Sequence, residues 1–206
     1  MLFYLLPLEH KNLITKSLIM EKYKIAVFVG SLRKESYNLK TAKTLIAVAP
    51  ESLSLEIVDI GSLPMFNEDL EATPPQEWTD LREQIVAADG LLFLTPEYNR
   101  SVPGVLKNAI DVGSRPYGQN SWNGKPAAVV SVSIGNISGF GANHHLRQSL
   151  TFVNVPTMAQ PEAYIGDAGS LFDESGNLNN ESTKGFLKTF MEAFEKWVST
   201  IADKAE

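Results

Sequence analysis

Val29-Gly30-Ser31-Leu32-Arg33-Lys34-Glu35-Ser36-Tyr37-Asn38 joins the apolar run Tyr23–Val29 to a helical pattern, and this stretch decides the fold. A strand-to-helix turn gathers backbone N–H groups and the positive end of a helix dipole, which together suit a phosphate. Polar side chains that can bind the same anion are Ser31, Arg33, Ser36 and Asn38. We interpret the turn as a phosphate site, although a serine here is also a common helix cap.

Composition limits the remaining possibilities. The 206 residues, 44% of them hydrophobic, are enough for one domain with a full core. A net charge of −6 gives no basic surface for nucleic acid or an anionic membrane, so we expect neither as a partner. Cysteine is absent, so any redox function has to come from a bound cofactor.

The first nineteen residues differ from the rest of the chain. Their apolar segment, residues 1–8, is shorter than the about 20 residues of a membrane span and contains Pro7. It lacks the basic start and the cleavage site of a secretory signal. Met20 would make a natural start, so we expect residues 1–19 to be a disordered or loosely docked extension of a single domain, 20–206.

Strand and helix patterns alternate along the domain. Strands are predicted at residues 25–29, 53–60, 91–95, 127–132 and 157–165, and helices at 39–49, 78–88, 105–112, 144–152 and 182–202. Ser101 lies near the expected cap of the third helix, with Pro103 in its first turn. The alternation predicts a doubly wound α/β fold, a three-layer α/β/α sandwich with a five-stranded parallel sheet in the order 2-1-3-4-5.

Two more unusual loops follow strands of this sheet. Residues 95–104 follow the third strand, and the small residues of 133–139 follow the fourth. Loops after strands one, three and four converge at the carboxyl edge of such a sheet, where ligands bind. The first turn lacks both the dinucleotide fingerprint and the nucleoside triphosphate loop, so a mononucleotide with a flat ring fits best. FMN is the leading candidate.

Two long motifs carry a family resemblance. Gly30-Ser-Leu-Arg-Lys-Glu-Ser-Tyr-Asn38 matches G-S-x-R-x-x-S-x-N, and Thr95-Pro-Glu-Tyr-Asn-Arg-Ser-Val-Pro-Gly-Val-Leu-Lys-Asn-Ala-Ile-Asp111 matches T-P-E-Y-N-x-S-x-P-G-x-L-K-N-A-I-D. The sequence resembles the NAD(P)H-dependent FMN reductases of flavodoxin-like fold, especially the bacterial quinone and chromate reductase branch. The resemblance spans roughly residues 24–197.

This resemblance implies a set of FMN-binding residues. They are Ser31, Arg33, Ser36, Tyr37 and Asn38 in the phosphate turn, Pro96, Glu97, Tyr98 and Asn99 along the ring, and Ser133 and Gly135 in the third loop. The implied reaction moves hydride from NADH or NADPH to flavin N5 and then passes electrons to a quinone, azo dye, chromate or free flavin. Because the flavin carries the chemistry, we name no catalytic side chain.

Several of these residues also have simpler interpretations. Tyr98 could be a packing aromatic. A loop carboxylate such as Glu97 is usually solvated or bonded to nearby amides, so we favour backbone contact with the ring over a role as a general base. Lys107 and Asp111 are spaced for an ordinary surface ion pair. The adjacent His144 and His145 would point about 100° apart on a helix, so we expect no metal site.

Two other functions use the same fold and cofactor. A flavodoxin-like electron carrier needs no nicotinamide site, and a non-catalytic flavin-binding protein would turn over slowly with every acceptor. The resemblance also implies a homodimer or a homotetramer, with residues 115–122 or 147–162 at the boundary. We expect a cytoplasmic enzyme. Its natural acceptor and its choice between NADH and NADPH stay open.

Overall fold

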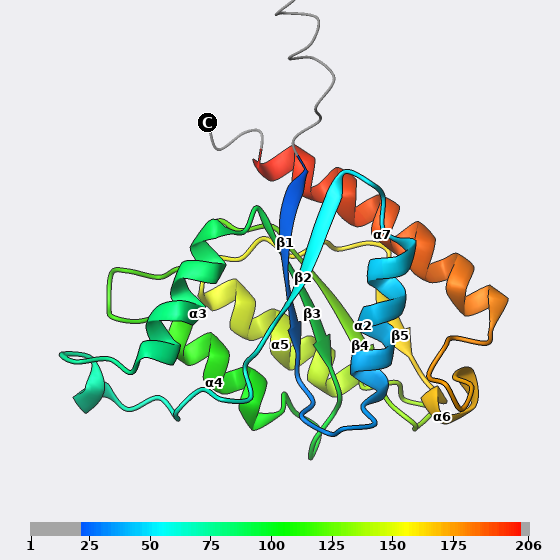
Figure 1. Ribbon diagram of the computed structural model, residues 1–206, viewed down its shortest axis with the longest axis horizontal. Helices are drawn as coiled ribbons and strands as arrows, with labels where there is room; N and C mark the ends of the chain where they lie inside the picture. The colour runs from blue at the N-terminus through cyan, green and yellow to red at the C-terminus, as the bar shows by residue number, and fades with distance from the viewer. Residues whose placement is uncertain (1–21, 203–206) are drawn as a thin grey trace, which may run out of the picture.

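The computed structural model describes residues 22–202, and within them the expected fold is confirmed. The sheet has five parallel strands in the order β2-β1-β3-β4-β5 (Figure 1). The strands are β1 (Tyr23–Val29), β2 (Leu53–Val58), β3 (Gly90–Thr95), β4 (Ala127–Val132) and β5 (Ala163–Ile165). The helices are α2 (Tyr37–Val48), η1 (Glu68–Leu70), α3 (Gln76–Ala87), α4 (Gly104–Gly113), α5 (Phe140–Phe152), α6 (Ala168–Leu171) and α7 (Glu181–Ala202). The expected extension, residues 1–19, lies outside the described residues.

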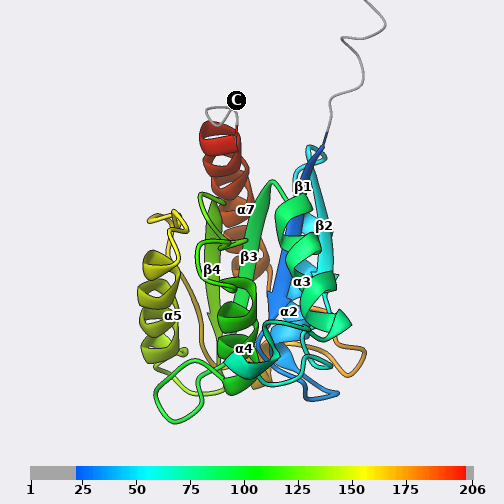
Figure 2. The ribbon, with the colours of Figure 1, turned by 90° about the vertical axis from the view of Figure 1, so that its left-hand side faces the viewer.

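Helices cover both faces of the sheet. α2 and α7 lie on one face, and α3, α4 and α5 lie on the other, as the two views show (Figures 1 and 2). Strands β3 and β4 are buried along their whole length, which explains why their sequences are continuous apolar runs. Under α3 to α5, Phe28 stacks on Phe93 with ring centroids 5.1 Å apart, and Trp122 meets Phe28 edge-on.

The last strand and the helix before it differ from prediction. We expected a strand over residues 157–165, but only β5 pairs continuously with β4. Thr157 makes one isolated bridge to Ala127, and Pro161 then has no N–H with which to extend a ladder. Helix α5 begins at Phe140, four residues before the predicted start, directly after Gly139 in the left-handed conformation.

The expected cap of α4 is wrong. Pro103 is the residue that precedes the helix, and no side chain in the described part of the chain caps it. The backbone of Ser101 instead pairs with that of Tyr98, and its hydroxyl lies 3.0 Å from His145 Nδ1. On the same helix Lys107 and Asp111 form the expected ion pair at 2.7 Å, with both side chains substantially exposed. None of the helices in residues 22–202 is both long and apolar enough to cross a bilayer.

Helix α7 provides a test of the packing. Phe194 is fully buried against the sheet, so Phe194→Ala should lower the free energy of unfolding by about 3–5 kcal/mol. Lys188→Ala on the exposed side of the same helix should change it by less than about 0.5 kcal/mol. Urea titration of both variants measures the difference. Equal losses would mean that α7 is not part of the core.

Candidate functional site

Three loops meet around one cavity at the carboxyl edge of the sheet, the lower edge in Figure 1. The cavity measures about 260 Å³ and is lined by Ser31, Arg33, Ser36, Tyr37, Asn38, Pro96, Glu97, Tyr98, Val132, Ser133 and Ile134. Nine of the eleven residues named from the sequence are in this lining. Asn99 and Gly135 are not in it. Val132 and Ile134 line the cavity without having been named, because an apolar side chain in a strand or loop carries no motif signal.

Ser36 caps helix α2 and lines the cavity at the same time. Its Oγ accepts a hydrogen bond from the Leu39 N–H at 3.2 Å, and its backbone is extended, as a cap requires. The capping interpretation is therefore confirmed. It uses a lone pair of the hydroxyl and leaves the O–H free to donate into the cavity. The positive end of the α2 dipole opens at the same point.

Asn38, in the first turn of α2, has one amide atom in use and one without a partner. Its Nδ2 donates to the Val132 carbonyl at 3.3 Å, which ties α2 to the end of β4. Its Oδ1 is buried and accepts no hydrogen bond within the described residues. Only 4% of the residue is exposed. A buried acceptor left unpaired is costly, so this oxygen calls for a donor from a ligand in the cavity.

Arg33 lies on the Tyr37 ring at the open side of the cavity. Its guanidinium carbon is 5.1 Å from the ring centroid, and Nη2 donates to the Glu35 carbonyl. Tyr37 stacks on Phe172 behind it, with centroids 6.0 Å apart. The arginine is thus oriented by an aromatic platform while its charge stays exposed to the cavity mouth.

The loop after β3 is a tight two-residue turn. Tyr98 and Ser101 exchange backbone hydrogen bonds of 3.1 and 3.0 Å, and the residues between them, Asn99 and Arg100, both have positive φ. Such a turn favours asparagine, whereas the left-handed conformation costs other residues about 1–2 kcal/mol. Asn99 therefore shapes the turn instead of lining the cavity. Tyr98 stands at the rim with 51% of its surface exposed.

Glu97 connects this turn to the start of α5. One carboxylate oxygen lies 3.1 Å from Arg100 Nη1, and the other accepts from the Ala142 N–H at 3.1 Å. A Cβ at Gly141 would come within 2.9 Å of that second oxygen, so only glycine allows the approach. The expectation that this carboxylate binds nearby amides is confirmed. The sequence showed no sign of Ala142 as its partner.

The loop after β4 is tied to β5 and to the start of α6 by backbone hydrogen bonds. The Ser133 N–H donates to Ile165, and its carbonyl accepts from Ala168, at 2.9 and 3.1 Å. The Ser133 hydroxyl accepts from the Gly135 N–H at 3.1 Å, which explains why Gly135 shapes the loop without reaching the cavity. Three hydrogen bonds of Ser133 therefore position the third wall of the cavity.

The two adjacent histidines of α5 have different partners. His145 meets Ser101, as noted above, and His144 Nε2 lies 3.1 Å from the Tyr164 hydroxyl. That hydroxyl donates to Glu162 at 2.9 Å, and burial together with the carboxylate raises the pKa of Tyr164 to about 12. Residues 22–202 contain no group of three or more His, Asp or Glu side chains placed to hold a metal ion.

A five-stranded doubly wound sheet in this order, with its cavity at the strand ends, defines a flavodoxin-like protein. Residues 23–170 match the NADPH-dependent FMN reductase family. A quinone reductase from Pseudomonas putida is 63% identical over 177 residues, covering 85% of this chain and 95% of its own. A 2-hydroxy-1,4-benzoquinone reductase from a Burkholderia species is 46% identical over 175 residues, covering 85% and 96%.

A solved structure agrees with these relatives. FerB, an NAD(P)H:(acceptor) oxidoreductase flavoenzyme from Paracoccus denitrificans, superposes with a TM-score of 0.82 at 44% identity, covering 87% of this chain and 98% of its own. The chain belongs to the NADPH-dependent FMN reductase family.

Arg33→Ala tests the expectation that this guanidinium binds the phosphate of FMN. Removing a charge-assisted contact should weaken FMN binding about tenfold or more, measured by flavin fluorescence during titration of the apoprotein. Lys196→Ala, which removes an exposed cation from α7, should leave the affinity unchanged. Equal affinities for the Arg33 variant and the unchanged protein would refute the phosphate assignment.

Proposed function

We propose that the protein is an FMN-dependent NAD(P)H oxidoreductase that reduces quinones. The observation that carries the proposal is the cavity at the carboxyl edge of the sheet. In it a helix N-terminus, a guanidinium and a buried amide oxygen that has no partner within residues 22–202 converge. The helix N-terminus and the guanidinium suit the anionic phosphate of FMN, and the amide oxygen suits its hydroxylated chain.

The residues divide between those parts. Ser31, Arg33 and Ser36, with the N-terminus of α2, offer donors and positive potential to the phosphate. The partnerless atom of Asn38 is an acceptor, so it suits a ribityl hydroxyl, which can donate, better than a fully ionised phosphate. Residues 96–98 and Ser133 would border the ring, with Asn99 and Gly135 shaping their loops.

The chain supplies orientation in place of acid–base chemistry. When bound, FMN accepts a hydride from a nicotinamide nucleotide and gives electrons to the acceptor. Both carboxylate oxygens of Glu97 are already engaged, so this side chain is held as a brace. Tyr98 and the exposed Ile134 present apolar surface at the cavity mouth, where a flat acceptor can rest.

The names of two relatives support quinones as the acceptors. The two relatives described above, from Pseudomonas putida and a Burkholderia species, are both named as quinone reductases. Azo compounds, chromate and free flavin are further acceptors that an open ring face would admit. Since NADH and NADPH are intracellular coenzymes, we propose a cytoplasmic location.

The visible spectrum tests this function directly. The purified protein, or apoprotein given FMN, should show flavin bands that bleach on anaerobic addition of NADPH or NADH and return on addition of a quinone. Initial rates against both substrates should give parallel double-reciprocal lines, because one ring face serves both in turn. Flavin bands that persist with either nucleotide would favour an electron carrier or a non-catalytic flavin protein.

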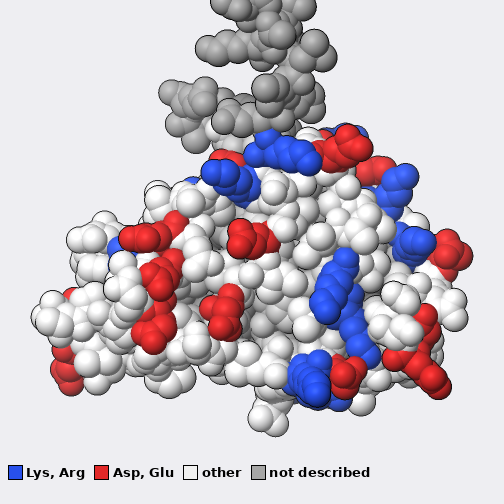
Figure 3. All heavy atoms as spheres, viewed as in Figure 1, with Lys and Arg blue, Asp and Glu red and all other residues white. Residues whose placement is uncertain are grey.

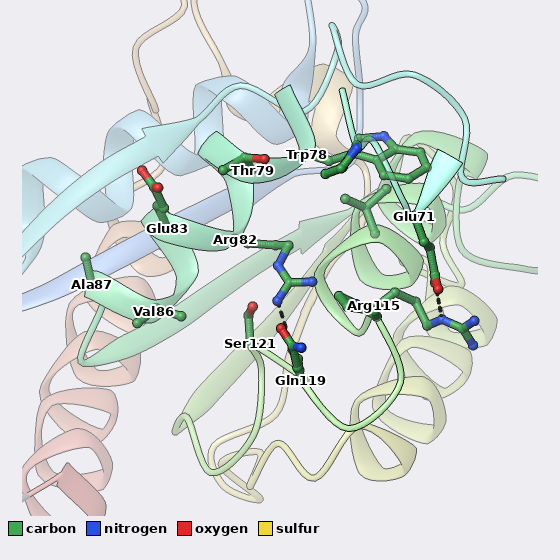
Figure 4. Close-up of a pocket in the computed structure, with 13 residues that line it drawn as sticks. Glu71, Trp78, Thr79, Arg82, Glu83, Val86, Ala87, Arg115, Gln119 and Ser121 are labelled. Atoms are coloured by element: carbon green, nitrogen blue, oxygen red, sulfur yellow. Dashed lines mark hydrogen bonds and ion pairs between the residues drawn. The ribbon is translucent and has the colours of Figure 1, made fainter. Parts of the chain in front are cut away.

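We further propose that the protein forms a homodimer, which can pair into a homotetramer. A groove of about 540 Å³ runs between α3 and the segment 115–121, with Trp78 and Val86 among its walls (Figure 4). Arg82 donates to the Gln119 carbonyl, and Arg115 pairs with Glu71 at 2.7 Å. Apolar walls with charges of both signs at the edge suit a self-complementary contact with a second copy.

Val86→Lys tests this contact. Val86 lines the groove with 60% of its surface exposed, so a buried lysine there should shift the protein toward monomer in sedimentation at micromolar concentration. The monomer mass is 22.7 kDa. Ile57→Lys places the same charge on an exposed residue of β2 and should leave the association state unchanged. A dimer that survives Val86→Lys would exclude the groove as its interface.

A further inference from the structure

A second cavity lies next to the proposed FMN site and shares Ser36 with it. It measures about 460 Å³ and runs along α2 toward the start of α7. We call it the lysine pocket, because four of its lining residues are Lys34, Lys40, Lys43 and Lys184, against one acidic residue, Glu35. Figure 3 shows basic side chains gathered over α2 and the turn before it.

The positive charge of the lysine pocket is only partly compensated. Lys40 Nζ pairs with Glu35 at 3.1 Å, which accounts for the single acid. Lys184 Nζ lies 4.0 Å from the Glu181 carboxylate, which is the limit of an ion pair. Glu181 itself does not line the pocket. Lys34 and Lys43 form no ion pair within residues 22–202. A chain with net charge −6 thus holds a pocket with net positive charge beside its cofactor cavity.

The far wall of the lysine pocket is a fixed turn. The Asp173 carboxylate accepts from the Asn177 N–H at 2.8 Å, and Gly176 occupies the left-handed conformation between them. A Cβ on Gly176 would lie 3.3 Å from Lys40 Cε, so this turn packs directly on the lysine stem. The pocket is therefore bounded by α2 on one side and by this turn on the other, with Lys34, Lys43 and Lys184 exposed at its surface.

We propose that the lysine pocket binds the 2′-phosphate of NADPH and so makes NADPH the preferred electron donor. This inference rests on the proposed function, since it places the nicotinamide of the same molecule over the FMN ring. Two riboses and a pyrophosphate separate the nicotinamide from the 2′-phosphate, so the dinucleotide is long enough to pass the phosphate end of FMN. Its terminal group is a phosphate monoester, and ammonium groups are suitable partners for that dianion.

The chemistry of a phosphate monoester could also come from a second source. Free FMN, acting as an acceptor, carries the same group on a shorter chain. We favour NADPH because the lysine pocket shares Ser36 with the proposed phosphate site but none of the residues proposed to border the ring, so a phosphate group bound in it has to be remote from the reacting ring. The two sources predict different kinetic changes when lysines are removed.

The experiment compares the donors in the FMN-loaded protein. Lys43→Gln/Lys184→Gln removes two pocket lysines that do not line the FMN cavity. The ratio of kcat/KM for NADPH to that for NADH, with a quinone acceptor, should exceed about ten in the unchanged protein. It should fall at least about tenfold in the variant, mainly through KM for NADPH. FMN content should stay the same.

Controls separate this inference from general charge effects. Lys188→Gln/Lys196→Gln removes the same charge from exposed positions of α7 and should keep the ratio. Inhibition by 2′,5′-ADP, competitive with NADPH, should be lost in the pocket variant and kept in this control. A ratio near one in the unchanged protein, or equal changes for both donors, would overturn the proposal.

The remaining outcomes are equally decisive. A variant that raises KM for free FMN as acceptor while keeping the donor ratio would assign the pocket to the acceptor and overturn our choice. If neither nucleotide bleached the flavin, the proposed function itself would fail. Bleaching by both nucleotides with equal constants would refute only the lysine pocket.

Discussion

The parallel pairing of β1 with β3 is the constraint on which the site depends. It sets the Gly30 N–H 2.8 Å from the Leu94 carbonyl, so the turn after β1 leaves the sheet beside the loop after β3. A Cβ on Gly30 would lie 3.2 Å from that carbonyl and 3.3 Å from Pro96, closer than nearly all real contacts. Because Gly30 has no side chain, the turn after β1 can pack directly against the loop after β3.

Residues of the cavity combine a framework role with a free atom. The Ser36 hydroxyl accepts from the helix and keeps its proton for a ligand. The Asn38 amide donates to β4 and keeps its oxygen. In each case the framework contact fixes the rotamer, so the remaining atom is already oriented before any ligand arrives. Preorganisation of this kind reduces the entropy lost on binding.

Local patterns were enough to predict the alternation of strands and helices and the polar turn after β1, whereas the residues of the second and third loops were named from the family motifs. The buried runs of β3 and β4, and the polar turn after β1, carry their information in neighbouring residues. The errors depend on contacts distant in sequence. From the sequence, Ser101 was expected to cap α4. In the structure the turn at Asn99 and Arg100 places its hydroxyl beside His145 instead. Glu97 binds the N–H of Ala142, 45 residues away, and no motif in the sequence indicates this pairing.

The charge distribution separates the two sides of the sheet. Lysines gather along α2, while η1 and α3 carry mostly acidic side chains, some of them paired with arginine (Figure 3). A net charge of −6 repels a nucleotide phosphate at long range, so a cationic pocket beside the cofactor cavity concentrates the attraction where the nucleotide must approach. A neutral quinone is neither repelled by the net charge of the protein nor attracted by the lysine pocket. Electrostatics can therefore guide the donor while the acceptor is selected only by shape and apolar contact at the cavity mouth.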